Sequence, residues 1–238
     1  MNALATATPT TLSVEQYRLV TIKLHDSVLA DRGRSAMLRD RFLEPLSDSK
    51  VPVIVNMHDI QVLTMSAADE LVARWLERAR SPRHALIAVF ATYSEDIRDT
   101  LHAVLRDARQ VAYRVRSLPG PAERPRGKDI LGDLSPTHQR TLDHLMELTN
   151  GSATASEVAQ GLGLTPTAAT NRLTDLAIRG LLFRLPQPGR GGDVFAYPWP
   201  RSEKALEQLY RRIAAGDLNA GNGNIHSNGH RPTVAKPA

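Results

Sequence analysis

The sequence predicts an α/β unit followed by a mainly α-helical unit. Strand-like and helix-like patterns alternate through the first half, an order typical of a sheet with helices packed against it. The second half contains three helical patterns and then two short strand patterns around a glycine-rich loop. A stretch rich in proline, glycine and arginine, residues 117–133, separates the two halves.

Four strands and three helices account for the first half. Residues 17–25 alternate apolar and polar side chains, which is typical of a half-buried strand. Residues 51–57 and 85–90 are nearly continuous apolar runs, as in strands covered on both faces. The remaining elements are a strand at 111–115 and helices at 32–46, 66–80 and 95–109. This order predicts a four-stranded mixed sheet with helices packed on it.

Capping residues define the helices of the second half. Ser135-Pro136 and Thr165-Pro166 each place a favourable N-cap residue before a proline in the first helical position. Trp199 is expected to pack where the last helix meets the preceding ones. The predicted elements are helices at 135–149, 156–162, 165–179 and 204–215, and strands at 181–185 and 194–197.

Composition divides the chain into five segments. Residues 1–14 and 216–238 are rich in small and polar residues and are expected to be unstructured. Residues 15–116 and 134–215 are each long enough for a small domain, and residues 117–133 are expected to link them.

Composition also excludes several classes of function. The chain has 238 residues, 42% of them apolar, and no cysteine, so it has no disulfide framework and no thiolate nucleophile or metal ligand. The histidines lack zinc-binding spacing and His58-Asp59 lacks a nearby nucleophile. We therefore expect a non-enzymatic protein with no catalytic residue, no metal and no cofactor. The lack of a membrane-spanning apolar run or a signal peptide favours a cytoplasmic protein with no membrane contact. A formal net charge of +5 permits nucleic-acid binding without requiring it.

Residues 154–197 predict a helix-turn-helix followed by a hairpin wing. Ala169, Leu173 and Leu176 recur at helical spacing and would pack inward. The opposite face carries short hydroxyl, amide and methyl groups that can reach base edges, and arginines suited to phosphate contact. The predicted interface with double-stranded DNA comprises Thr165, Thr167, Ala168, Thr170, Asn171, Arg172, Thr174, Arg179 and, at the tip of the wing, Arg190.

A basic cluster in the linker has two possible interpretations. Arg124, Arg126 and Lys128 could form a phosphate-contacting arm beside the helix-turn-helix. The alternative, which we favour, is an ordinary solvated tether.

The run LTPTAATNRLTDLAIRGLLFR (164–184), followed by Gly-Arg-Gly, resembles the winged helix of MarR-type bacterial regulators. The resemblance covers residues 134–200. It implies that the helix from Thr165 is the recognition helix and that residues 186–193 form the wing. Such recognition helices often carry more basic residues, and Asp175 here implies a lower DNA affinity. A winged helix that contacts only protein is the alternative.

The run VIVNMHDIQVLTMSAADELVARWL (53–76) resembles the strand-turn-helix of STAS domains, the sulphate-transporter and anti-sigma-antagonist class, over residues 15–115. That resemblance implies a non-enzymatic module for self-association or partner binding. Methionine stands in the usual phosphoacceptor position, at Met65, so the usual phosphorylation switch is missing. Ser66 is then expected to be a helix N-cap rather than a phosphorylation site, and Thr64 is a weaker candidate for modification.

Together these patterns predict a sequence-specific DNA-binding protein, a transcriptional regulator. The winged helix would read DNA, and the STAS-like domain would bind a protein partner or a second copy in a homodimer or larger assembly. One alternative is an adaptor in a bacterial signalling or defence pathway that binds no DNA. Others are a DNA-partition or filament-forming protein, and a small-ligand sensor with a pocket in the first domain.

Overall fold

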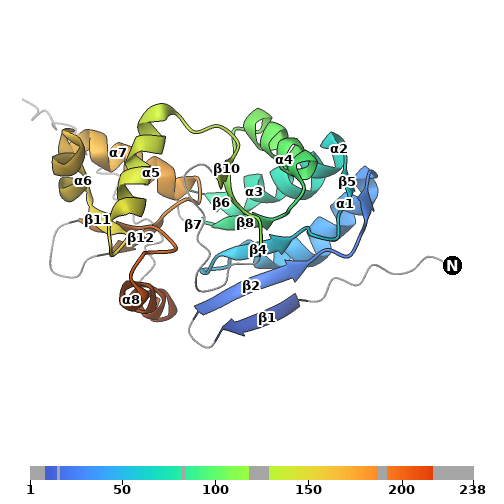
Figure 1. Ribbon diagram of the computed structural model, residues 1–238, viewed down its shortest axis with the longest axis horizontal. Helices are drawn as coiled ribbons and strands as arrows, with labels where there is room; N and C mark the ends of the chain where they lie inside the picture. Colours follow the sequence, from blue (N-terminus) through green and yellow to red (C-terminus); the bar gives the residue numbers. More distant parts are fainter. Residues whose placement is uncertain (1–8, 15–16, 82–83, 118–128, 187–191, 217–238) are drawn as a thin grey trace, which may run out of the picture.

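The computed structural model describes residues 9–14, 17–81, 84–117, 129–186 and 192–216. It is a mixed α/β structure built on a six-stranded sheet in the order β1-β2-β4-β8-β9-β10 (Figure 1). The strands are β1 (Pro9–Val14), β2 (Tyr17–Lys23), β4 (Val53–Asn56), β8 (Ala88–Ala91), β9 (Ala112–Val115) and β10 (Ile130–Leu131). The central four are parallel, and each edge strand is antiparallel to its neighbour.

The four predicted strands are confirmed as the four central ones, but the expected four-stranded sheet gains a strand at each edge. β1 falls in the segment expected to be unstructured, and β10 in the expected linker. Composition concealed both strands. β1 lies in an Ala/Thr/Pro-rich stretch, and β10 has only two residues, too few for an alternating pattern to show.

The helices of the first half all cover one face of the sheet. Because the central strands follow one another in chain order, right-handed crossovers place every connecting helix on the same side. The first connection is α1 (Arg32–Leu38), continued by a π turn (Arg39–Leu43) and a 3-10 turn (Glu44–Leu46). The second is one continuous helix made of α2 (Met65–Ala68), a π turn (Asp69–Ala73) and α3 (Arg74–Ala79), and the third is α4 (Glu95–Asp107).

The start of α2 corrects the expected N-cap. Thr64, not Ser66, caps this helix: its Oγ1 accepts a hydrogen bond from the Ala67 amide at 3.3 Å. Ser66 lies exposed in the first turn, with its Oγ 3.3 Å from the Thr64 hydroxyl. Thr64 has the extended backbone that a capping residue requires, and Ser66 is already helical.

Two short strand pairs complete the first half. β3 (Val28–Leu29) pairs with β5 (Val62–Leu63) in parallel, and β6 (Arg80–Ser81) pairs with β7 (His84–Ala85) in antiparallel.

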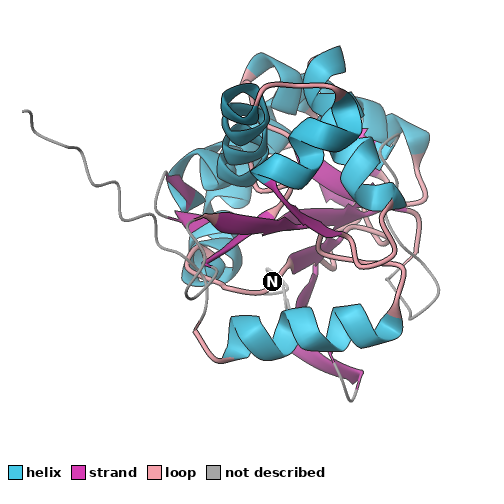
Figure 2. Cartoon of the chain, turned by 90° about the vertical axis from the view of Figure 1, so that its left-hand side faces the viewer, coloured by secondary structure: helices cyan, strands magenta, loops and turns pink. Residues whose placement is uncertain are grey.

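The second half contains helices packed against a small antiparallel sheet. Its elements are α5 (Pro136–Glu147), β11 (Ser152–Thr154), α6 (Ala155–Leu162), α7 (Pro166–Ile178), β12 (Phe183–Pro186), β13 (Asp193–Ala196) and α8 (Glu203–Ala214). The strands form a three-stranded sheet in the order β11-β13-β12. The predicted hairpin and helices are confirmed, and β11 is an addition. α8 lies apart from α5–α7, with the small sheet between them (Figures 1 and 2).

The two halves share a hydrophobic core. Alternate residues of the central strands point to opposite faces of the sheet, so Val55 and Phe90 pack with the helices of the first half. Ile54, Val89 and Tyr113 point the other way and belong to the same buried cluster as the second half's apolar residues. The second half therefore buries the sheet face that those helices leave open.

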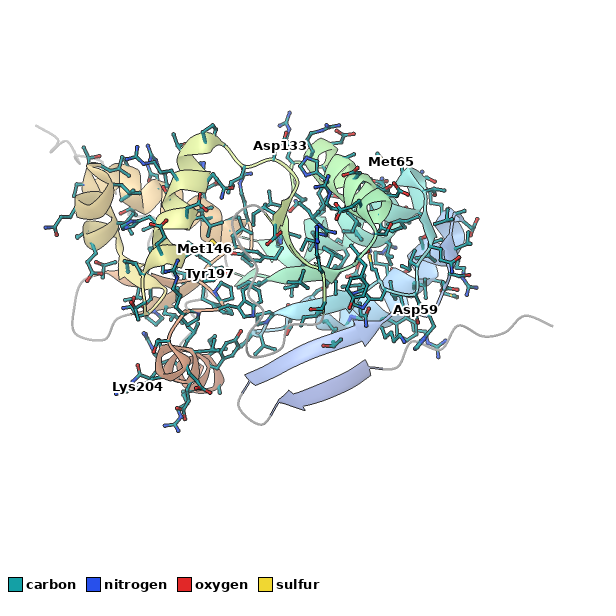
Figure 3. The ribbon with its side chains drawn as sticks, in the orientation of Figure 1. Asp59, Met65, Asp133, Met146, Tyr197 and Lys204 are labelled. Carbon is teal, nitrogen blue, oxygen red and sulfur yellow. The ribbon has the colours of Figure 1, made fainter. Side chains whose placement is uncertain are left out.

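Tyr113 is the central contact between the halves. It is fully buried, and its hydroxyl donates a 2.6 Å hydrogen bond to the Leu181 carbonyl just beyond α7. Its ring makes edge contacts with Trp199 at 5.1 Å and with Tyr197 at 6.0 Å. Tyr197 is labelled between the two halves in Figure 3. Trp199 thus contacts the main sheet. The sequence places Trp199 only where the last helix meets the preceding ones and does not predict this contact.

Candidate nucleic-acid interface

The turn between α6 and α7 sets the direction of α7. Gly163 closes α6 with a φ of +66°, a conformation that side-chain-bearing residues rarely adopt. A Cβ at this position would have no atom within 4 Å, so the backbone conformation rather than space selects glycine. Thr165 then caps α7 by accepting a 3.2 Å hydrogen bond from the Ala168 amide, and Pro166 is the first helical residue.

One side of α7 is core, as predicted. Ala169, Leu173 and Leu176 are fully buried and pack against α5 and α6. Burial of these side chains holds the helix in one rotational setting, because turning it would expose them to water. The opposite side must then face outward.

That outward side carries most of the predicted DNA-contacting residues. Thr165, Thr167, Thr170 and Asn171 are exposed, and Ala168, Arg172 and Thr174 are partly exposed. The Thr170 hydroxyl donates to the Pro166 carbonyl at 2.9 Å, which leaves its oxygen free to accept from a ligand. Ile178 continues this side of the helix at 36% exposure. The structure therefore brings together a surface of short polar side chains.

Arg179 is placed differently from the other predicted residues. Its Nε lies 2.8 Å from the Asp175 carboxylate one turn earlier, and its side chain is only 34% exposed. Burial is the main cause that lowers the pKa of Arg80, and the positive charge of Arg179 lowers that pKa further. Arg179 thus lies toward the first half of the chain, so Arg172 is the better placed of the two helix arginines for a phosphate.

His138 was not predicted as part of this region. It lies in the first turn of α5, with its Nδ1 2.6 Å from the Ser135 hydroxyl and its Nε2 3.2 Å from the Asp175 carboxylate. Burial lowers the pKa of His138, Asp175 raises it, and Arg179 and Arg172 lower it further. The contact joins α5 to α7 through the Asp175 carboxylate. Sequence patterns could not reveal it, because the two residues come from different helices.

The far end of α7 is anchored to the first half. Gly180 has a φ of +71°, and a Cβ there would lie 2.1 Å from the Leu86 carbonyl oxygen. The Arg80 guanidinium lies beside it and donates to the carbonyls of Leu86 and Val111 at 3.2 and 2.6 Å. The amino-terminal part of α7 is therefore open to solvent while its carboxyl end is packed against the α/β half.

Four predicted contact residues, Arg190, Arg124, Arg126 and Lys128, lie outside the described residues. The strands that flank the predicted wing are described, and a 2.5 Å ion pair between Arg184 Nε and Asp193 links them. Arg184 therefore already has an anionic partner within the hairpin.

His58 and Asp59 turn to different partners. Asp59 pairs with Lys23 at 3.0 Å and with His25 at 3.4 Å, and the hydrogen bond from Lys23 is the largest cause that lowers the pKa of Asp59. His58 instead stacks on Tyr93, with 4.1 Å between ring centroids. Within the described ranges, no cluster of three or more His, Asp or Glu side chains is arranged to hold a metal.

No family of known proteins, no curated protein and no solved structure matches this chain. No helix in the described part of the chain has the length and apolar character needed to cross a bilayer.

Proposed function

We propose that the chain is a sequence-specific DNA-binding protein, a transcriptional regulator, in which residues 134–200 form a winged helix. In this proposal α7 is the recognition helix and the hairpin of β12 and β13 is the wing. The observation that carries the proposal is the outward face of α7, where exposed threonine and asparagine side chains lie opposite a fully buried apolar face.

The chemistry of that face suits the major groove. Asn171 can bind an adenine edge through the oxygen and the NH2 group of its side-chain amide, and Thr167 can donate to or accept from a base. The small side chain of Ala168 lets the helix backbone come close and can contact a thymine methyl group. Arg172 would contact phosphate and contribute to affinity for any sequence.

The weak electrostatic attraction expected between this chain and DNA favours binding as an assembly of two or more copies. The whole chain carries a formal charge of only +5, and Asp175 lies on α7 itself. A module with few phosphate contacts binds modestly, so two copies on adjacent half-sites would bind much more tightly than one. We assign this self-association, or the binding of a partner protein, to the α/β half, which resembles STAS domains.

Exposed apolar side chains on the α/β half support a protein contact there. Val28 and Val62, opposite each other in the β3–β5 pair, are 52% and 48% exposed, and Met65 at the start of α2 is 47% exposed. Figure 3 labels Met65 at the end of the molecule remote from the helices of the second half. The same surface favours the second candidate function, an adaptor that binds protein and no DNA.

Selection of bound fragments from random DNA by the full chain tests the proposal directly. Fluorescence anisotropy with the selected duplex should then show that Asn171→Ala weakens specific binding by roughly 1–3 kcal/mol while binding to unrelated DNA changes little. Arg172→Gln should weaken both and reduce the salt dependence, and Arg106→Gln on α4 is the matched control for a lost helical arginine. If no salt-sensitive DNA binding appears, the second candidate function, an adaptor that binds protein and no DNA, is better supported than the DNA-binding function.

A further inference from the structure

A cavity of about 430 Å³ lies between α4 and the edge of the main sheet formed by β9 and β10. Its charged lining comes from three arginines, one histidine and two carboxylates: Arg98, Arg114, Arg116, His102, Glu95 and Asp129. The volume falls within the range of small-molecule sites. The cavity is separate from the outward face of α7.

Arg114 is the residue that makes this cavity unusual. Its side chain is only 6% exposed, and its Nη2 donates to Glu95 at 2.7 Å and to the Thr92 carbonyl at 3.4 Å. Its Nε is buried and has no hydrogen-bond partner among the described residues. A buried guanidinium N–H without an acceptor is costly, so a residue of this kind in the lining of a cavity is unusual.

Glu95 holds the arginines together. Its Oε1 lies 2.7 Å from Arg114 and 3.5 Å from Arg116, and its Oε2 lies 3.2 Å from Arg98. The hydrogen bond from Arg114 is the main cause that lowers the pKa of Glu95, so this carboxylate is ionised at neutral pH. One carboxylate thus bridges three guanidinium groups and leaves them further donors for a second anion.

The cavity and its surroundings are nearly balanced in charge, because acidic side chains offset the three arginines. The Gly132 amide donates to His102 Nδ1 at 3.2 Å, and His102 Nε2 lies 3.7 Å from Asp133. Asp133 is labelled beside α4 in Figure 3. Asp129 also lines the cavity, and Asp99 pairs with Arg98 from outside it. Binding here would therefore depend on directed hydrogen bonds more than on a general attraction of anions.

We propose that this cavity is a binding site for a small phosphate-bearing molecule. Oxygens of the phosphate would accept from the Arg114, Arg116 and Arg98 guanidinium groups that line the cavity. Arginine suits phosphate because its planar fork of donors matches two oxygens at once. The site adjoins the carboxyl ends of parallel strands, where open α/β sheets commonly bind ligands. This inference does not depend on DNA binding.

Isothermal titration of the full chain with inorganic pyrophosphate, at an ionic strength held constant with sodium chloride, tests the proposal. We expect saturable binding that Arg116→Gln weakens by about tenfold or more, the usual effect of removing a hydrogen bond to a charged group. Arg106→Gln, an exposed arginine on the same helix but outside the cavity, should leave the affinity unchanged.

Three results would overturn the site. The first is the absence of saturable binding, and the second is binding that Arg116→Gln and Arg98→Gln leave intact. Both of these arginines are substantially exposed, so the variants should fold, and circular dichroism would verify this. The third is binding of citrate with no binding of pyrophosphate, which would refute the assignment to phosphate.

Discussion

Replacing Tyr113 with phenylalanine would test whether the two halves of the chain form one cooperative unit. The substitution keeps the ring between the main sheet and Trp199 and removes only the hydroxyl, which donates the 2.6 Å hydrogen bond to Leu181. Both residues are fully buried, so water cannot replace the lost donor. The Leu181 carbonyl would be left without this partner at the point where α7 meets the α/β half.

The expected loss of stability follows from that geometry. Leaving a buried carbonyl without its donor costs about 1–3 kcal/mol. With a urea m-value of about 2 kcal/mol/M, the unfolding midpoint should fall by about 0.5–1.5 M. Tryptophan fluorescence measures it, because Trp75 lies in the helix-covered core and Trp199 in the shared core. In each single-tryptophan variant, W75F and W199F, the midpoint from fluorescence should equal the midpoint from far-UV circular dichroism if the halves unfold together.

Tyr93→Phe is the matched control, because Tyr93 is 63% exposed and its hydroxyl can be replaced by water. It should change the midpoint little. A Tyr113→Phe variant as stable as the Tyr93→Phe control would refute the role assigned to the hydroxyl. A fluorescence midpoint that differs from the circular-dichroism midpoint of the same single-tryptophan protein would refute the shared core as a cooperative unit.

Three further predictions concern α5, α7 and the turns beside them. Burial lowers the pKa of His138, so the folded state favours the neutral ring, and stability should fall as pH decreases below the ordinary value of 6.5. His138→Gln should flatten this dependence, measured as urea midpoints between pH 7 and about 5; an unchanged slope would contradict it. Gly180→Ala should destabilise by more than the roughly 1–2 kcal/mol expected for Gly163→Ala, because both have positive φ but only Gly180 meets a backbone atom. Equal thermal shifts would argue against that close contact. Leu173→Ala should cost about 2–5 kcal/mol by calorimetry, whereas Ile178→Ala should cost far less, and similar losses would mean that α7 is turned differently.

Local patterns predicted most of the elements because they report burial along one segment. The alternation at 17–25 and the apolar runs at 51–57 and 85–90 correspond to β2, β4 and β8. Capping residues were less decisive, since Thr64 and Ser66 both suit an N-cap and only the backbone conformation distinguishes them. The two edge strands lacked any pattern strong enough to predict them.

Of the two candidate sites, one could be predicted from local sequence patterns and the other could not. The outward face of α7 could be predicted from the spacing of Ala169, Leu173 and Leu176, because a helix that buries one side exposes the other. The cavity around Arg114 could not, because its lining comes from α4, β9 and β10, and no short stretch of sequence contains it.

The sequence by itself determined most of the buried residues and most of the elements they form, since hydrophobic periodicity is a local property. It predicted two separate units because a proline-rich stretch interrupts that periodicity. Only the tertiary structure decided what covers each apolar surface. An apolar strand such as β4 must be buried on both faces, but its sequence does not specify which segment covers each face. In the structure the second face is covered by the carboxyl-terminal half.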